Sequence, residues 1–267
     1  MDWLQKALDK SKESDTANFE FKTSSSMKNT YSSENTSGQA ETRIAVREIT
    51  PPNPLNEKLI LTKQSDTHSV TAYNFLSAKT LSMMKGKNSN TLAITSPTSR
   101  AGTTLTAANL ATSISRSLHD TVVLVELDLR KPVFYHYFGL ENREKGLSDH
   151  LIDNAELKDT LIKMSGTDLV LLTAGTTLEQ HPNILASPQI RQFVRDISAL
   201  YSDHLIIFDL PALLDTDDAL PFLQNVGASL LVVEEGINTS EHINQCTDIL
   251  KNHGLLGAVL NKSKSIS

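Results

Sequence analysis

The chain has 267 residues and one cysteine, Cys246, so an internal disulfide is excluded and a structural thiol is expected. The net charge of −6 and the pI near 5.7 leave no basic footprint, which argues against a nucleic-acid partner. The sequence shows neither an apolar run long enough to span a bilayer nor a signal peptide, and we therefore expect a cytoplasmic protein.

The first 56 residues are expected to lie outside the main domain. Residues 1–13 place Trp3, Leu4 and Leu8 on one side of a short amphipathic helix, which predicts a docking element. The alternative is a helix that packs on its own domain. Residues 14–56 are rich in Ser, Thr, Asn and Glu, a composition typical of a disordered linker. We assign residues 57–263 to the folded domain and 264–267 to a tail.

Residues 92–118 have the pattern of a strand, a loop and a helix. Residues 92–94 are an apolar run, and residues 103–118 have helical periodicity. The first turn of such a helix presents free N–H groups and a positive dipole end, which favour an anion.

The loop between them departs from the phosphate-binding pattern G-x-x-x-x-G-K-[ST]. In that pattern the lysine neutralises the outer phosphates and the hydroxyl binds Mg²⁺. Gly102 and Thr104 match the second glycine and the hydroxyl, whereas Pro97 and Thr103 replace the first glycine and the lysine. The segment predicts a phosphate site without its lysine, and a polar turn before a core helix remains the alternative.

Two later apolar runs end in carboxylates. Residues 121–125 lead to Glu126 and Asp128, and residues 204–208 lead to Asp209. Ligands of open α/β sheets bind at the carboxyl ends of the strands. A lone carboxylate at that edge can bind the water shell of Mg²⁺. Asp128 and Asp209 are therefore predicted to lie beside the phosphate loop.

The remaining pattern completes an α/β fold with a doubly wound, mostly parallel sheet. Residues 169–172, 229–233 and 255–260 are expected strands, and Ser187 begins a helix. Asn238 or Thr239 caps another helix, and Gly254 ends it. Asn261, after the last strand, is a candidate to contact an adenine base, and a turn asparagine is the alternative.

The residues around these strand ends resemble a known family, the cytoplasmic bacterial tyrosine kinases (BY-kinases) of capsule and exopolysaccharide biosynthesis, which are relatives of the MinD and ParA ATPases. The similarity runs from about residue 69 to residue 262. Its most specific stretches are residues 126–132 (Glu-Leu-Asp-Leu-Arg-Lys-Pro), 138–140, 183–188, 209–211, 217–219 and 257–262.

The resemblance implies a P-loop NTPase fold with a deviant Walker A loop, and ATP or ADP with Mg²⁺ as cofactor. It assigns Mg²⁺ to Thr104, Asp128 and Asp209, and the last two are also the family's catalytic positions. The implied cofactor-binding residues are Ser99, Arg100, Ala101, Gly102, Thr103, Thr104 and Asn261.

Three features of that family are altered in this chain. The family loop usually reads P-G-x-G-K-[ST], and Ser99, Arg100 and Thr103 replace its proline, glycine and lysine. An E-x-x-R-x-x-R oligomerisation motif aligns with residues 71–77 but has lost all three charged groups. The family's C-terminal tyrosine cluster is missing, because no tyrosine follows Tyr201.

These departures favour a degenerate member with lost or weakened tyrosine autokinase activity. Such a protein would regulate or bind a membrane polysaccharide co-polymerase, through which it could associate with the membrane, and could form a homo-oligomer. One alternative is an active ATP-binding tyrosine kinase that controls polysaccharide export and chain length, with Arg100 or a partner residue supplying the missing charge. Another is a MinD/ParA-like positioning ATPase, which usually needs a C-terminal amphipathic membrane helix that is not seen in this sequence.

Overall fold

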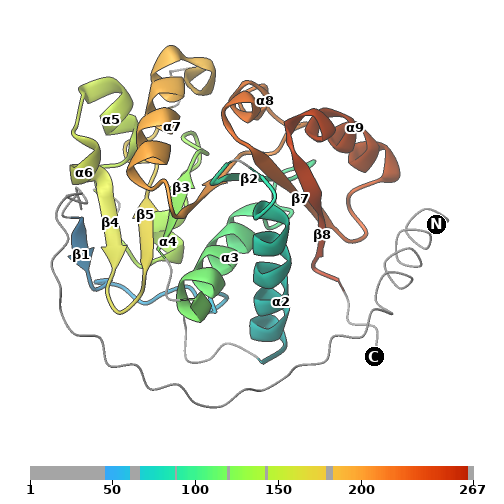
Figure 1. The fold of residues 1–267 in the computed structure, drawn as a ribbon, viewed down its shortest axis with the longest axis horizontal. Helices are drawn as coiled ribbons and strands as arrows, with labels where there is room; N and C mark the ends of the chain where they lie inside the picture. The colour runs from blue at the N-terminus through green and yellow to red at the C-terminus, as the bar shows by residue number, and fades with distance from the viewer. Residues whose placement is uncertain are drawn as a thin grey trace, which may run out of the picture. The chain divides into compact units, whose positions relative to one another are not determined.

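Eight strands of the described residues form one sheet, in the order β1-β4-β5-β3-β6-β2-β7-β8 (Figure 1). The computed structural model describes residues 46–60, 67–87, 89–118, 121–141, 144–178 and 183–263. The expected helix 1–13, linker residues 14–45 and the tail 264–267 lie outside them. The strands are β1 (Arg47–Ile49), β2 (Thr91–Thr95), β3 (Val122–Glu126), β4 (Leu161–Met164), β5 (Leu169–Leu172), β6 (Leu205–Asp209), β7 (Ala228–Glu234) and β8 (Leu255–Asn261).

The sheet is parallel except where β4 runs antiparallel to β5. The three central strands β3, β6 and β2 are the ones that end in the predicted site. Asp209 of β6 lies opposite Glu126 of β3 and Ile94 of β2 in the strand register. The adjacency of these three strand ends, predicted from the sequence, is confirmed.

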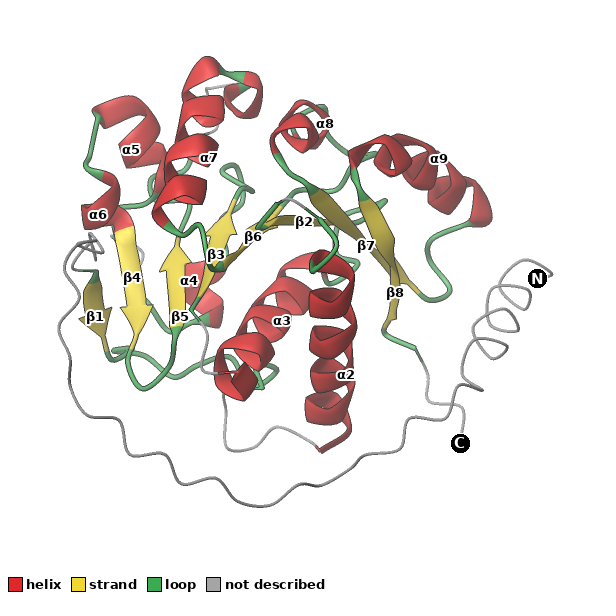
Figure 2. Ribbon diagram, viewed as in Figure 1, coloured by secondary structure: helices red, strands yellow, loops and turns green. Residues whose placement is uncertain are grey.

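Helices cover both faces of this sheet, which gives three layers (Figure 2). α3 and α4 pack on one face, and α2 packs against α3. α5, α7, α8 and α9 contribute to the core on the other face. The helices are α2 (Thr67–Met84), α3 (Thr103–Leu118), α4 (Phe134–Tyr137), α5 (Leu147–Asp153), α6 (Leu157–Thr160), α7 (Pro188–Leu200), α8 (Ala219–Phe222) and α9 (Ser240–Leu250), with 3-10 turns at Ile184–Ala186, Leu223–Asn225 and Lys251–His253.

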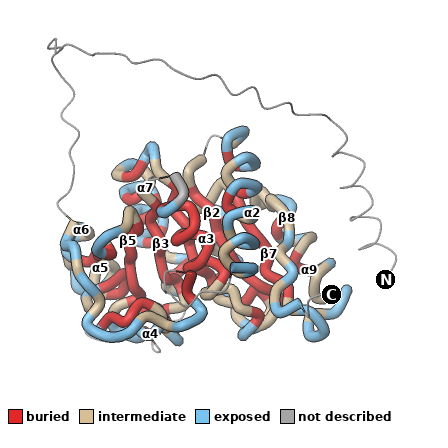
Figure 3. The backbone as a smooth tube through the Cα atoms, turned by 90° about the horizontal axis from the view of Figure 1, so that it is seen from below, coloured by how far each residue is buried: buried red, intermediate tan, exposed pale blue. Residues whose placement is uncertain are grey.

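Strand β3 shows why a continuous apolar run forms the centre of such a fold. Val122 and Leu124 face the core beneath α3, whereas Val123 and Val125 face the core beneath α7. Because successive side chains of a strand point to opposite faces, both sets must be apolar when both faces are covered. Figure 3 shows the resulting buried interior and the exposed outer sides of the helices.

The expected helix signals are present in the structure. The Ser187 side chain accepts a hydrogen bond from the Ile190 amide at 3.3 Å, with Pro188 as the first helical residue. Thr239, rather than Asn238, caps α9 by accepting from His242. Gly254 has a φ of 67°, a left-handed conformation that glycine adopts without strain.

The linker expectation is wrong for residues 46–56. β1 pairs with β4, and the amides of Asn53 and Asn56 donate to the carbonyls of Gly139 and Tyr137 at 3.1 and 2.9 Å. β1 is held by backbone hydrogen bonds at the sheet edge, and residues 53 and 56 by backbone hydrogen bonds to the end of α4 and the turn after it. Such bonds do not depend on the type of side chain, so composition did not predict this order. The folded unit therefore begins before residue 57. Within the described residues, no helix has the length and apolar character needed to cross a membrane.

Candidate nucleotide site

The phosphate-loop segment joins β2 to the N-terminus of α3. Residues 95–102 form a turn in which Arg100 and Gly102 have φ values of 69° and 94°. The φ of Gly102 favours glycine, and a Cβ there would lie 2.1 Å from the Nδ2 atom of Asn261 and displace that side chain. The helix starts at Thr103 and directs its first amides toward the loop. The loop and helix therefore have the arrangement that the sequence predicts for an anion site.

Side chains from distant parts of the chain hold the first half of this loop. The Nδ2 atom of Asn238, which follows β7, donates to the Thr98 hydroxyl at 2.8 Å. The Asp215 carboxylate, which follows β6, accepts from the amide and the hydroxyl of Ser99 at 2.6 and 2.5 Å. These two donors lower the pKa of Asp215 below its usual value. Asp215 therefore remains an anion at neutral pH and is already bound by the loop.

Two residues from the end of β8 hold the second half. Lys262 Nζ donates to the Arg100 carbonyl at 2.7 Å, and Asn261 Nδ2 donates to the Ala101 carbonyl at 2.8 Å. Asn238, Asp215, Asn261 and Lys262 are called the clamp residues below. The Asn261 amide group is thus bound to the loop. Its predicted contact with an adenine base is not tested by this hydrogen bond and stays a prediction.

Asp209 lies at the centre of the acidic strand ends. Its side chain is buried, and its Oδ1 atom has no hydrogen-bond partner among the described residues. Burial raises the pKa of Asp209 well above its usual value, and the nearby Glu126 and Asp128 carboxylates add to the rise. A hydrogen bond from the Thr104 hydroxyl acts in the opposite direction. The site thus has an unsatisfied buried oxygen that a cation could bind.

These groups fit the Mg²⁺ that the family implies. Mg²⁺ prefers oxygen ligands and is commonly held by one or two carboxylates together with substrate phosphates. Asp209 and Thr104 supply a carboxylate and a hydroxyl at the end of the phosphate loop. In the part of the chain that the structure describes, no group of three or more His, Cys, Asp or Glu side chains could hold a metal. Phosphate oxygens and water would therefore complete the coordination.

The Glu126 carboxylate binds backbone amides of neighbouring segments. Its Oε1 atom accepts from the amides of Val133 and Phe134 at 2.5 and 2.9 Å, and its Oε2 atom accepts from Ala174 at 3.0 Å. Burial outweighs these hydrogen bonds and raises the pKa of Glu126 to about 7. The long glutamate arm connects the end of β3 to α4 and to the segment after β5.

Asp128 lies nearer the surface than Glu126. Its Oδ1 atom accepts from the Lys131 amide at 3.0 Å. Partial burial raises the pKa of Asp128. The neighbouring Arg130 forms an ion pair with Asp218 at 2.9 Å. A backbone hydrogen bond from Arg130 also reaches the Asp128 carboxylate, and the charge of Asp128 adds to the raised pKa of Asp209. Thr104, Asp128 and Asp209 thus lie near one another, and their role in binding Mg²⁺ stays a prediction.

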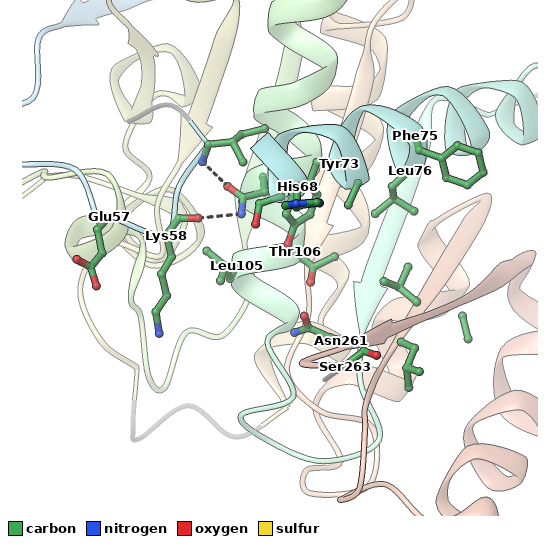
Figure 4. Close-up of a pocket in the computed structure, with 17 residues that line it drawn as sticks. Glu57, Lys58, His68, Tyr73, Phe75, Leu76, Leu105, Thr106, Asn261 and Ser263 are labelled. Carbon is green, nitrogen blue, oxygen red and sulfur yellow. Dashed lines mark hydrogen bonds between the residues drawn. The ribbon is translucent and has the colours of Figure 1, made fainter. Parts of the chain in front are cut away.

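A groove of about 910 Å³ lies beside the loop (Figure 4). It runs between α2, the first turns of α3 and the end of β8, and a site of this size suits a nucleoside or a similar small molecule. Leu105 and Thr106 of α3 line it next to Asn261. Tyr73 and Leu76 of α2 line the other side. Lys58 and Ile60, from the segment before α2, complete the lining. The groove could not be predicted from the sequence, because its walls come from four separate segments.

The segment that aligns with the oligomerisation motif forms part of α2. Thr71 and Asn74 are exposed, whereas Ser77 is buried and donates to the Tyr73 carbonyl at 2.7 Å. The Asn74 side chain also accepts from Ser113 of α3 at 2.8 Å. The Thr71 hydroxyl donates to the Thr67 carbonyl at 2.8 Å. All three motif positions thus make contacts within the chain.

Comparison with known proteins identifies relatives among kinases. The chain is 30% identical over 181 residues to the tyrosine-protein kinase Etk of Escherichia coli K12, covering 67% of this chain and 24% of Etk. It is 31% identical to YwqD of Bacillus subtilis, covering 64% of this chain and 71% of YwqD. It is 30% identical to CpsD of Streptococcus pneumoniae, covering 67% of this chain and 78% of CpsD. The chain thus spans about a quarter of Etk and most of the two shorter kinases.

Solved structures agree with this relationship. The kinase domain of Etk superimposes with a TM-score of 0.63 at 27% identity, over 74% of this chain and 78% of that domain. A cobyrinic acid a,c-diamide synthase from Mycobacterium smegmatis, solved with an ATP analogue and magnesium, shares the fold with a TM-score of 0.53 at 17% identity, over 67% of this chain and 77% of that one. No protein-family model matches the chain. By its sequence relatives, its sheet and its phosphate loop, the chain belongs to the bacterial tyrosine-protein kinases with a P-loop NTPase fold.

Proposed function

We propose that this chain binds ATP or ADP with Mg²⁺ at the phosphate loop, and that its phosphoryl-transfer activity is weakened. In this proposal the protein is a nucleotide-binding regulatory member of its family rather than an efficient tyrosine kinase. The proposal concerns this chain alone, because it spans only about a quarter of Etk.

One observation carries the nucleotide assignment. Among the residues that the structure describes, none is a hydrogen-bond partner of the buried Oδ1 atom of Asp209, and the Thr104 hydroxyl at the start of α3 binds the same carboxylate. A buried carboxylate oxygen is costly unless it is paired, and a bound cation would remove that cost. Mg²⁺ with the phosphates of a nucleotide supplies the cation and its remaining ligands.

The groove suits the rest of the nucleotide. α3 begins immediately after the phosphate loop, and its Leu105 and Thr106 line the groove together with Asn261 (Figure 4). A nucleotide with its phosphates on the helix N-terminus would therefore place its nucleoside in this groove. The mixture of apolar and amide groups fits an aromatic base with a few hydrogen-bonding atoms.

The weakened activity follows from the loop. Thr103 supplies no positive charge to stabilise the phosphates in the transition state. A charge-assisted hydrogen bond is worth about 1.5 to 3 kcal/mol, which corresponds to roughly a 10- to 100-fold change in binding. Arg100 also places a side chain where the family's loop has a glycine. We therefore expect the missing lysine to reduce rate more than folding.

Calorimetric titration with ATP tests both parts. The native chain should bind ATP in the presence of Mg²⁺ and lose affinity at least about tenfold in Asp209→Asn, because the buried carboxylate is needed for the metal. A Thr103→Lys, Arg100→Gly double variant should bind at least about tenfold more tightly. Absence of binding even by the double variant would refute the nucleotide site. Efficient ATP turnover by the native chain would refute the weakened activity.

An active tyrosine kinase is the second candidate, because Arg100 and Lys262 place two cations on the loop. Phosphotyrosine formation on the native chain with MgATP, abolished by Asp209→Asn, would support it. No phosphotyrosine from the native chain, together with its appearance in the double variant, would support the degenerate enzyme.

We further propose a regulatory role with a membrane polysaccharide co-polymerase, on the basis of the family resemblance. Residues 1–13, which lie outside the described residues, are the proposed docking element. Their deletion should abolish copurification with such a membrane protein and leave ATP binding intact. Unchanged copurification would exclude docking through these residues.

A further inference from the structure

Two successive residues at the end of β8 bind two successive carbonyls of the phosphate loop. Lys262 Nζ lies 2.7 Å from the Arg100 carbonyl oxygen, and Asn261 Nδ2 lies 2.8 Å from the Ala101 carbonyl oxygen. The Asn261 side chain also lies directly against Gly102. The two contacts therefore fix the orientation of two adjacent peptide planes, the one after Arg100 and the one after Ala101.

The orientation of these planes decides which way the loop amides point. In a trans peptide the carbonyl and the following N–H point in opposite directions. When the carbonyls of Arg100 and Ala101 are directed to the end of β8, the amides of Ala101 and Gly102 are directed away from it. Successive amides that point to one side form an anion-binding concavity. The positive φ values of Arg100 and Gly102 are part of this turn.

Lys262 is itself held in place for this contact. Its backbone has a φ of 57°, which is uncommon for a residue with a side chain. Its ammonium group forms an ion pair at 2.9 Å with Glu234 at the end of β7. Glu234 is the register partner of Asn261 across the two strands. The β7–β8 pair thus presents both donors to the loop from one strand end.

We propose that Asn261 and Lys262 are positioning residues that hold the phosphate loop of this chain in its anion-binding conformation. The proposal rests on the proposed nucleotide site for its function and on the loop contacts for its geometry. It explains how a loop with Arg100 and Thr103 in place of a glycine and a lysine keeps the conformation of a phosphate loop. Neither residue needs to contact the reacting phosphate.

Hydrogen exchange on the nucleotide-free protein tests the geometry without any ligand. Lys262→Met and Asn261→Leu keep the approximate size of each side chain and remove its donor. Both variants should exchange the hydrogen-bonded amides on either side of these contacts, those of Ser99 and Thr106, at least about tenfold faster, while the amides of the central strand β3 keep their native rates. Lys262→Arg keeps a donor and should restore most of the protection.

The matched control is Lys251→Met, which removes an exposed lysine that pairs with Asp248 at 2.8 Å. It should leave the loop amides unchanged. If Lys262→Met and Asn261→Leu exchange these amides at the native rate, the proposal is wrong.

Titration with MgATP and with inorganic pyrophosphate separates this inference from the proposed function. Lys262→Met should bind both about tenfold more weakly, because the loop must be reordered on binding. If the native chain binds neither ligand but the variants lose loop protection, the positioning role stands and nucleotide binding by the native chain is refuted. If loop protection and affinity are both unchanged in the variants, the positioning role is refuted and the nucleotide site stands.

Discussion

Arg100 adopts a left-handed conformation, with a φ of 69°, at a loop position where the family has glycine. A residue with a Cβ is strained there by about 1 kcal/mol, whereas glycine is not. We expect Arg100→Gly to raise the free energy of unfolding by up to about 1 kcal/mol, because relief of strain outweighs the added freedom of the unfolded chain. Urea unfolding measures this change.

The same substitution in a helix is the control. Arg195 lies within α7 and is exposed. Arg195→Gly should lower the free energy of unfolding by about 1 kcal/mol, because glycine is a poor helix former. A similar loss of stability in both variants would show that Arg100 is not strained.

Glu126 makes the stability of the fold depend on pH. Its pKa is about 7 in the folded chain and 4.5 in its ordinary state, because burial disfavours the charged form. Between these values the folded state binds more protons than the unfolded state. The free energy of unfolding contributed by Glu126 therefore falls as pH rises through this range, by up to about 1.4 kcal/mol per pH unit.

The variant Glu126→Gln should remove this dependence. Urea unfolding between about pH 5 and about pH 8 should show a flatter profile than that of the native chain, because glutamine does not titrate. Its absolute stability should be lower, since its amide NH₂ group cannot accept from the third amide. Glu241→Gln, on the exposed first turn of α9, should keep the native profile. Parallel profiles for the native chain and Glu126→Gln would contradict the assignment.

At the scale of elements, Asn109 joins α3 to the segment before α2. Its side chain is buried, accepts from the Ile60 amide at 3.0 Å and donates to the Lys58 carbonyl at 3.1 Å. Asn109→Ala should lower the free energy of unfolding by about 2 to 4 kcal/mol, because it leaves two backbone groups unpaired. Chemical denaturation measures the loss, and Asn252→Ala on an exposed turn should cost less than about 0.5 kcal/mol.

The elements differ in how well they could be predicted from their sequences. The central strands β2, β3 and β6 were predictable because burial on both faces requires continuous apolar runs. The edge strand β1 was not, since its residues Arg47 and Glu48 are exposed and only its backbone is paired. The antiparallel β4 was also missed, because Lys163 interrupts its short apolar run.

The site residues also differ in whether a local sequence pattern marks them or a contact with a distant part of the chain. Gly102, Thr104 and Asp209 could be found because each stands in a short pattern at a strand end or a helix start. Of the clamp residues, Asn261 was a candidate only as a contact for the base. The loop contacts of the clamp residues could not be found, since Asp215 lies 116 residues from Ser99 and Lys262 lies 162 residues from Arg100 along the chain. No local pattern marks a side chain whose hydrogen-bond partner in the loop is so far away in the sequence.

At the scale of the whole molecule, nucleotide binding should stabilise the fold. MgATP at about 100 times its dissociation constant should raise the free energy of unfolding by about 2.7 kcal/mol. For a folded unit of this size the melting temperature should rise by roughly 5 to 10 °C, which scanning calorimetry can measure. Chelation of Mg²⁺ should remove most of the shift. An equal shift with and without Mg²⁺ would contradict the metal assignment to Asp209.

The distance between the loop and its β8 donors has a consequence for synthesis on the ribosome. Asn261 follows Ala101 by 160 residues, an interval of roughly 8 to 32 s at about 5 to 20 residues per second. During that time the nascent loop lacks the donors that orient it. If these donors are required, ATP can bind only after the last strand has emerged and joined the sheet. Nucleotide occupancy would then distinguish a finished domain from an incomplete one.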